Sequence, residues 1–368
     1  MSFDIIYMKA IIFAGGTGIR LWPLSRRKSP KQFEKIIGNK STLQLAVDRL
    51  IPDFKHSDIY ISTNVLYADI VKKQLPGIPE ANFFFEPEKK DVAPAIALAM
   101  GILSKLSPKE PVAILWSDHL VKQVSLFKKV LKIAGSEIEK NPDKIIFIAN
   151  KPRFPSINLG YIHVGEQLKE KEGINIYKFE GLKYKPNEET AEKFFQSKKY
   201  GWNLGYFVSS ADFIYKYFER LAPNIYNNTE LILKNYGKDS YQSFLKQAYG
   251  KVESINFDNA ILENLDKKDA FVIVEDIGWS DVGSWEALKE ALQLKTEENV
   301  INGKVYLDNV KDSLIYNYDE KKMILGVDLE EHIIINTQDA ILIAKKNSMG
   351  KVKKIIESFP GTEHENLT

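Results

Sequence analysis

The chain has 368 residues, of which 44% are hydrophobic, and a formal net charge of +2. Because this length exceeds the usual size of one domain, we expect two domains with a sizeable core. The small net charge argues against a dedicated nucleic-acid binder, and the absence of cysteine excludes disulfides, thiolate metal sites and cysteine nucleophiles.

No strongly apolar segment opens the chain, and no apolar run approaches the roughly 18 residues that a membrane span requires. We therefore expect a cytoplasmic protein that binds no membrane.

Residues 8–149 alternate between strand-like and helix-like segments. Strands are expected at 9–14, 58–62, 82–86, 112–116 and 144–149, and helices at 42–51, 67–74, 93–105 and 125–140. This alternation predicts an α/β fold, in which helices cover a mostly parallel sheet. Ligands of such sheets bind beyond the carboxyl ends of the strands.

A glycine-rich turn follows the first predicted strand, in the segment Ala14-Gly15-Gly16-Thr17-Gly18-Ile19-Arg20-Leu21-Trp22-Pro23. Three glycines in four residues let backbone N–H groups face an anion with no Cβ in the way. The dinucleotide fingerprint and the Walker loop are disfavoured, because neither the further glycine nor the Gly-Lys-Ser/Thr that they require follows. A tight turn alone would explain the glycines but not the nearby cations Arg20 and Lys31. We therefore interpret the segment as a phosphate-binding loop.

Two aspartates stand at candidate ligand positions. Asp118 follows the predicted strand 112–116, and Asp281 lies in the turn 280–285. The glycine loop and Asp118 both come at the carboxyl ends of predicted strands, where we expect one cleft. On the residues alone, each aspartate could equally cap a helix or organise its own turn.

The pattern changes after the helix-like segment 285–294. Short apolar runs recur at 305–307, 314–316, 323–327, 332–335 and 340–344, with turn residues between them, and 350–359 is helix-like. These runs predict a small β domain over 296–368, packed against the rest because no low-complexity linker separates them.

Further motifs accompany the glycine loop. They are Ala93-Pro94-Ala95-Ile96-Ala97-Leu98-Ala99, Ser117-Asp118-His119, Gly160-Tyr161-Ile162, Trp202-Asn203-Leu204-Gly205 and Gly278-Trp279-Ser280-Asp281-Val282-Gly283-Ser284-Trp285. Together they resemble the landmarks of the sugar-nucleotide pyrophosphorylases, and most closely those of the mannose-1-phosphate guanylyltransferases. The resemblance covers nearly the whole chain.

This resemblance implies a Rossmann-like nucleotidyltransferase domain over 8–295 and, over 296–368, a short left-handed β-helix through which two copies could form a homodimer. It also implies transfer of a guanylyl group from GTP to mannose 1-phosphate, with release of pyrophosphate and with Mg²⁺ as cofactor. Asp118 and Asp281 would hold the metal. The nucleotide would lie against Ala14, Gly15, Gly16, Thr17, Gly18, Arg20, Lys31, Ala93 and Pro94, where Arg20 and Lys31 would act in catalysis, and the sugar phosphate against Gly160, Lys185 and Asn203.

Two departures from the family pattern leave the substrate open. Tyr184 stands before Lys185-Pro186 where the family usually has a glutamate, and Lys90-Asp91-Val92 stands where it tends to have arginine, asparagine and threonine. Another sugar, another base, or a catalytically silent relative that binds a nucleotide sugar and regulates a partner therefore remain alternatives. A kinase is disfavoured because no kinase loop is present.

Overall fold

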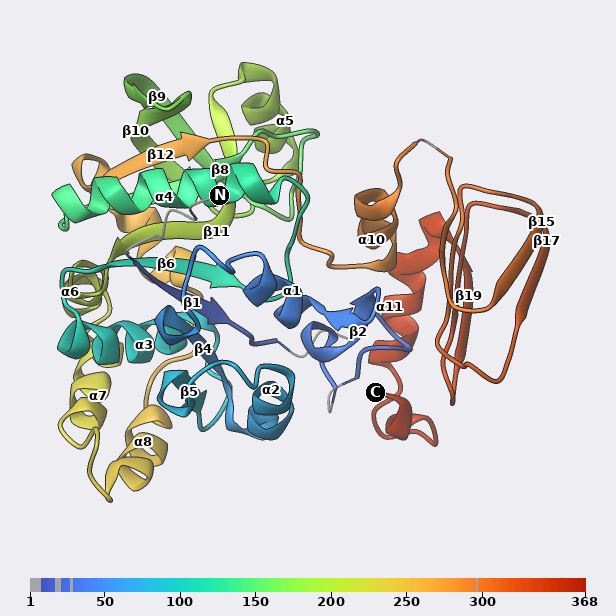
Figure 1. Ribbon diagram of the computed structural model, residues 1–368, viewed down its shortest axis with the longest axis horizontal. Coiled ribbons are helices and arrows are strands. Elements are labelled where there is room, and N and C mark those ends of the chain that lie inside the picture. Colours follow the sequence, from blue (N-terminus) through green and yellow to red (C-terminus); the bar gives the residue numbers. More distant parts are fainter. Residues whose placement is uncertain (1–7, 17–20, 27–28, 296) are drawn as a thin grey trace. The chain divides into compact units, whose positions relative to one another are not determined.

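The computed structural model describes residues 8–16, 21–26, 29–295 and 297–368 (Figure 1). The chain packs into two compact units. Of the described residues, the first unit comprises 8–15, 47–116 and 121–278, and the second comprises 16, 21–26, 29–46, 117–120, 279–295 and 297–368.

A nine-stranded sheet forms the centre of the first unit, in the order β5-β4-β1-β6-β11-β8-β12-β10-β9. Its strands are β1 (Lys9–Phe13), β4 (Ile59–Asn64), β5 (Phe83–Glu86), β6 (Pro111–Trp116), β8 (Ile145–Asn150), β9 (Gly160–Lys171), β10 (Ile174–Lys183), β11 (Tyr200–Ser210) and β12 (Ala270–Val274). The pairings of β1 with β4 and β6, of β4 with β5 and of β8 with β12 are parallel, whereas β10 and β11 run against their neighbours. The expected α/β fold with a mostly parallel sheet is confirmed.

Helices cover both faces of this sheet, because successive residues of a strand point to opposite faces. On β11, Tyr206 contacts Phe127 of α4 (Val124–Lys140), while Phe207 contacts Phe257 of α9 (Phe257–Ala260). Figure 1 shows α4 on one side of the sheet and α3 (Val92–Leu106) on the other. The remaining α-helices of the first unit are α2 (Ala68–Gln74), α5 (Glu188–Ser197), α6 (Ala211–Leu221), α7 (Pro223–Leu233) and α8 (Tyr241–Tyr249), and most of α1 (Thr42–Asp48) belongs to the second unit.

The C-terminal strands belong to the second unit and stack in register. Strands β14 (Val300–Asn302), β16 (Leu314–Asn317) and β18 (His332–Asn336) pair in parallel, as do β15 (Val305–Lys311) and β17 (Ile324–Glu330), while β19 (Ile341–Lys345) adds an antiparallel edge. This confirms a β-rich C-terminal region. Parallel stacking of successive turns is what a β-helix requires; the left-handed sense of the coil stays a prediction.

Large aromatic and aliphatic side chains tie residues 21–37 and 282–295 to these strands. Trp22, Val282 and Trp285 share a buried core with Leu314 and Ile333, and Trp285 Nε1 donates to the Trp22 carbonyl at 2.9 Å. Helices α10 (Trp285–Leu292) and α11 (Met349–Glu357) flank this core. The packing unit thus includes segments on both sides of residue 295, and the division into functional domains at 295/296 stays a prediction.

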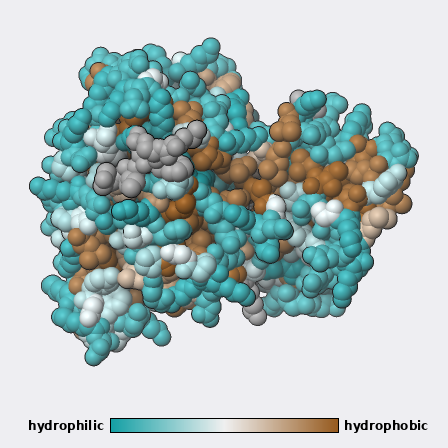
Figure 2. Space-filling model, viewed as in Figure 1, coloured by the Kyte–Doolittle hydropathy of each residue, from teal (hydrophilic) through white to brown (hydrophobic). Residues whose placement is uncertain are grey.

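Several apolar side chains of the C-terminal region stay exposed. Tyr306 on β15 and Leu325 on β17 are register partners with exposed fractions of 63% and 61%, and Ile343 on β19 reaches 68%. Figure 2 shows hydrophobic residues gathered over the strands of this region. None of the helices that the structure describes has the length and apolar character needed to cross a membrane.

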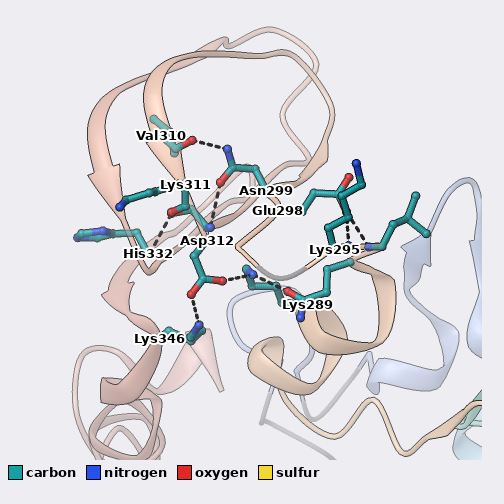
Figure 3. A network of polar contacts seen from close by, with 12 residues as sticks. Lys289, Lys295, Glu298, Asn299, Val310, Lys311, Asp312, His332 and Lys346 are labelled. Atoms are coloured by element: carbon teal, nitrogen blue, oxygen red, sulfur yellow. Dashed lines mark hydrogen bonds and ion pairs between the residues drawn. The ribbon is translucent and has the colours of Figure 1, made fainter.

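A buried lysine holds α10 to the turn between β15 and β16 (Figure 3). Lys289 is only 2% exposed, and its ammonium donates to Asp312, which also accepts from Lys346. Although partial burial raises the pKa of Asp312, hydrogen bonds from both lysines lower it below its usual value. Asp312 therefore supplies the negative charge that makes burial of Lys289 tolerable.

We predict that Asp312→Ala lowers the free energy of unfolding by about 3 kcal/mol, because it leaves the Lys289 ammonium buried without its counter-charge. Chemical denaturation measures the change. The matched control is Glu330→Ala, which removes the partner of Lys311 from a pair whose side chains are both more than half exposed, so its effect stays below about 1 kcal/mol. Equal losses in the two variants would contradict the role given to Asp312.

Candidate functional site

Two neighbouring strands end side by side in the first unit. Strands β1 and β6 are parallel, and their last residues, Phe13 and Trp116, are register partners with ring centroids 5.4 Å apart. The glycine turn follows Phe13 directly, and Ser117-Asp118 follows Trp116 directly. The two motifs therefore start from adjacent strand ends, as expected for a ligand-binding edge.

The structure describes the first three residues of the glycine turn, Ala14 to Gly16. Ala14 is buried, and its N–H donates to the Ser62 carbonyl at 2.8 Å, so this N–H serves the sheet. Gly15 and Gly16 are exposed, and Gly16 has a φ of +109°, which favours glycine. In the second unit, Gln32 Nε2 donates to the Gly16 carbonyl at 3.2 Å. Thr17, Gly18 and Arg20 lie outside the described residues.

Lys31 contacts every other member of a polar site in the second unit, which consists of Lys31, Asp118 and the turn at Asp281 and Val282. It lies in the short helix η1 (Lys31–Phe33) and is 5% exposed. Its Nζ lies 3.0 Å from Asp118 Oδ2 and 3.3 Å from each of the carbonyl oxygens of Asp281 and Val282. One ammonium group therefore joins the glycine-loop segment to the segments of both predicted metal ligands.

The environment of Asp118 favours its ionised form. Burial would raise the pKa of its carboxyl, but the Lys31 ammonium, His119 and the hydrogen bond from Lys31 lower it to about 2. The His119 ring packs edge-on against Trp279 with centroids 5.1 Å apart, and its Nε2 lies 3.8 Å from Asp118 Oδ1. His119 is thus placed to orient the Asp118 segment.

Asp281 lies in a strained turn. Its Oδ1 accepts from the Gly283 N–H at 3.3 Å, while Val282 has a φ of +40°, which is rare for a β-branched residue. Strain of this kind persists where surrounding contacts enforce it. Here the buried Lys31 holds both carbonyl groups of the turn, and the partly exposed Asp281 side chain retains its carboxylate for a further role.

A separate pocket of about 360 Å³ opens in the first unit. Its lining includes Trp116, Tyr184, Lys185, Gly205 and Asp258. The volume is that of a small-molecule site, and the lining combines aromatic surface with charges of both signs.

Lys185 enters this pocket from a strained backbone. Its φ is +43° although it precedes Pro186, and its ammonium lies 4.9 Å from the centroid of the Tyr184 ring. The Tyr184 N–H is taken by Glu263 Oε1 at 3.0 Å. Tyr184 therefore contributes an aromatic face to Lys185, and Glu263 holds the turn that presents it.

Asn203 is buried and held at both ends of its amide. Its Nδ2 donates to Asp258 Oδ1 at 2.8 Å, and its Oδ1 accepts from the Gly205 N–H at 3.0 Å. Gly160 is its register partner on β9, where an added Cβ would lie 3.2 Å from the Asn203 Cβ. Gly160 thus leaves room for Asn203.

The remaining predicted nucleotide contacts, Ala93 and Pro94, are buried in the first turn of α3, where the Ala93 N–H donates to the Ile255 carbonyl at 3.1 Å. Their predecessors Asp91 and Val92 line the pocket instead. A nucleotide role for Ala93 and Pro94 stays a prediction.

Comparison with known proteins identifies the family. The nucleotidyl transferase family model matches residues 9–298. The chain is 33% identical to mannose-1-phosphate guanylyltransferase 2 of Escherichia coli O157:H7, over 95% of this chain and 72% of that one. It is 32% identical to a mannose-1-phosphate guanylyltransferase of Salmonella montevideo, over 97% of this chain and 75% of that one.

The chain belongs to the mannose-1-phosphate guanylyltransferase family of nucleotidyl transferases. It is therefore an enzyme of the class that transfers a nucleotidyl group to a sugar 1-phosphate. The fold agrees: the crystal structure of a protein from Thermus thermophilus, described as a mannose-1-phosphate geranyltransferase, superposes with a TM-score of 0.84 at 23% identity and covers 95% of this chain and 98% of that one.

Three polar residues of these sites escaped sequence reasoning, namely Gln32, Asp258 and Glu263. Gln32 directly follows Lys31, so its place beside the predicted phosphate-binding loop was the available signal; its burial emerges only in the structure. Asp258 and Glu263 lie about 55 and 80 residues from their partners Asn203 and Tyr184. Asp258 lies in α9 and Glu263 in the short helix η5 (Leu262–Asn264), so only tertiary packing of distant segments brings them to these partners, and no local pattern could have revealed them.

We predict that Gly205→Ala disturbs the pocket through Trp116. Gly205 has a φ of +70°, and an added Cβ would lie 2.2 Å from Trp116 Nε1. The control Gly237→Ala has a similar φ of +79°, but no described residue comes within 4 Å of the added Cβ. We expect Gly205→Ala to lose about 2 kcal/mol more unfolding free energy than the control, since displacing an indole adds to the backbone strain. Equal losses of unfolding free energy in the two variants would show that the Trp116 indole can move aside without destabilising the fold.

Proposed function

We propose that the protein transfers a guanylyl group from GTP to mannose 1-phosphate and produces GDP-mannose and pyrophosphate. The observation that carries this proposal is the Lys31 ammonium, which gathers the Asp118 carboxylate and the Asp281 turn around one point. Acidic groups and a buried cation at one place suit the handling of a nucleoside triphosphate. The names of the relatives supply the substrates.

The donor set fits a magnesium ion. Mg²⁺ usually takes one or two carboxylates and completes its coordination with phosphate oxygens and water. Asp118 supplies an ionised carboxylate, and Asp281 supplies a second from the turn that Lys31 holds. Among the described residues no group of three or more acidic or histidine ligands gathers, so the proposed site consists of these two carboxylates. When bound, the ion would offset negative charge on the triphosphate.

The reaction we propose is an in-line displacement. An oxygen of the sugar phosphate forms a bond to the α-phosphorus of GTP, while the bond from that phosphorus to the β-phosphate oxygen breaks and pyrophosphate leaves. The attacking phosphate is already ionised near neutral pH, so no general base is required. Catalysis then rests on positioning and charge stabilisation. Lys31 supplies a cation for the triphosphate, and Arg20 is proposed to supply another.

The sugar phosphate is proposed to occupy the pocket of the first unit. Lys185 offers its phosphate an ammonium group that the Tyr184 ring holds in place. Asn203 and Gly160 do not line this pocket; Asn203 donates to the lining residue Asp258, and Gly160 packs against Asn203. Because the Tyr184 ring faces Lys185 rather than supplying a carboxylate, another sugar 1-phosphate remains the second candidate.

A panel of four nucleoside triphosphates against several sugar 1-phosphates, read by product mass, tests the proposal. We expect GDP-mannose and pyrophosphate only when GTP, mannose 1-phosphate and Mg²⁺ are all present. Binding of GDP-mannose without turnover would instead indicate a silent regulatory relative, and transfer of the γ-phosphate would indicate a kinase.

Asp281→Asn should lower kcat by about 100-fold or more at unchanged fold, since it removes one proposed metal ligand.

A further inference from the structure

The pocket of the first unit contains a carboxylate to which no role has been given. Asp258 lies on the short helix α9, lines the pocket, and is partly buried there. We propose that Asp258 is the group that reads the hydroxyls of the sugar, and that Asn203 is a positioning residue that orients it. This inference rests on the proposed function, because it names how the same pocket selects its sugar.

The hydrogen bonds of Asn203 support this division of roles. Its amide oxygen is fixed by the Gly205 N–H at 3.0 Å, and its nitrogen donates to Asp258 Oδ1 at 2.8 Å. Both functional groups of the amide are thus engaged within the protein, and they aim one carboxylate oxygen of Asp258. Gly160 lies so close that a Cβ added to it would stand 3.2 Å from the Asn203 Cβ, which leaves the side chain little room to turn.

Asp258 has no counter-charge in direct contact among the described residues. None of the described residues forms an ion pair with Asp258 within 4.0 Å. The charge of Lys185 favours the ionised carboxylate from longer range, and the charge of Glu263 disfavours it. Burial raises the pKa of Asp258 to about 6, although hydrogen bonds from its own backbone N–H and from Asn203 act against that rise. A partly buried carboxylate whose donors are all neutral and which has no ion-pair partner still gains from additional donors that arrive with a ligand.

Sugar hydroxyls match this need. A carboxylate has two oxygens and can accept from two vicinal hydroxyls at once. Two other lining residues suit the rest of such a ligand: Lys185 offers a cation for the phosphate, and Trp116 offers an aromatic face for the sugar ring. A buried acceptor without its hydroxyl is costly, so Asp258 would discriminate strongly against a sugar that lacks one hydroxyl.

Kinetics with deoxy analogues of mannose 1-phosphate tests the inference. For the wild-type protein we expect kcat/KM to fall about 50-fold for the analogue lacking the hydroxyl that Asp258 accepts. In Asp258→Asn the KM for mannose 1-phosphate should rise about 20-fold while the KM for nucleotide changes less than about twofold, and discrimination at that one hydroxyl should shrink to about threefold. Asp266→Asn, at an exposed carboxylate paired with Arg220, is the matched control and should change none of these values.

The positioning role of Asn203 has its own readout. Asn203→Ala should raise the same KM, and combining it with Asp258→Asn should add little further, because both act through one carboxylate. If Asp258→Asn does not fold, Asp258→Glu takes its place, since it keeps the charge but moves it, and should shift the discrimination among the analogues.

The outcomes separate the two proposals. If wild-type protein forms no nucleotide sugar at all, the proposed function fails, and calorimetric binding of mannose 1-phosphate to wild type and Asp258→Asn then tests the inference alone. If transfer occurs but Asp258→Asn keeps full discrimination at every hydroxyl, the inference is overturned. A rise confined to the KM for nucleotide would also overturn it, because Asp258 would then read the base.

Discussion

The Lys31 ammonium is the interaction on which the polar site of the second unit depends. An almost fully buried lysine requires a counter-charge and hydrogen-bond acceptors. The Asp118 carboxylate supplies the charge, and the carbonyls of Asp281 and Val282 supply the further acceptors. These partners come from segments separated by more than 160 residues. Removing the cation would leave the segments without a common anchor, so the geometry of both aspartates follows from this one contact.

The same contact explains how two acidic segments stay together before substrates bind. The Lys31 ammonium offsets the charge of Asp118. A triphosphate would offer Lys31 a stronger set of acceptors, since bonds to ionised phosphate oxygens are charge-assisted. Under the proposed function, Lys31 would exchange a carboxylate for a phosphate when the nucleotide binds, and Asp118 would then be available to hold the cation.

The pocket of the first unit uses a different principle. There the backbone provides the precision: Gly205 makes room for Trp116, Gly160 makes room for Asn203, and the left-handed Lys185 turns its side chain toward the Tyr184 ring. At the two glycines an added side chain would displace a neighbour, and at Lys185 an ordinary backbone conformation would turn the side chain elsewhere. Selection of the sugar is therefore proposed to rest on groups held by packing, with Asp258 as the acceptor of its hydroxyls.

Sequence alone predicted much of the fold, because strong apolar periodicity marks elements such as β1, β6, α3 and α4 to within two residues. It also predicted that the glycine turn and Asp118 come at the carboxyl ends of strands, since that depends only on strand direction. That these two strands, β1 and β6, are neighbours emerges only in the folded sheet. It could not predict the antiparallel β9, β10 and β11, which depend on pairing between distant segments. The same limit hid Asp258, whose partner Asn203 becomes its neighbour only when β11 joins the sheet.

The most direct test of the central claim is the rate of pyrophosphate release in Lys31→Met, measured beside Lys35→Met, which removes an exposed lysine nearby. We expect Lys31→Met to lower kcat about 100-fold or more while its circular dichroism spectrum stays that of the wild type, and we expect Lys35→Met to remain fully active. Near-normal turnover in a folded Lys31→Met protein would instead show that the site functions without this cation.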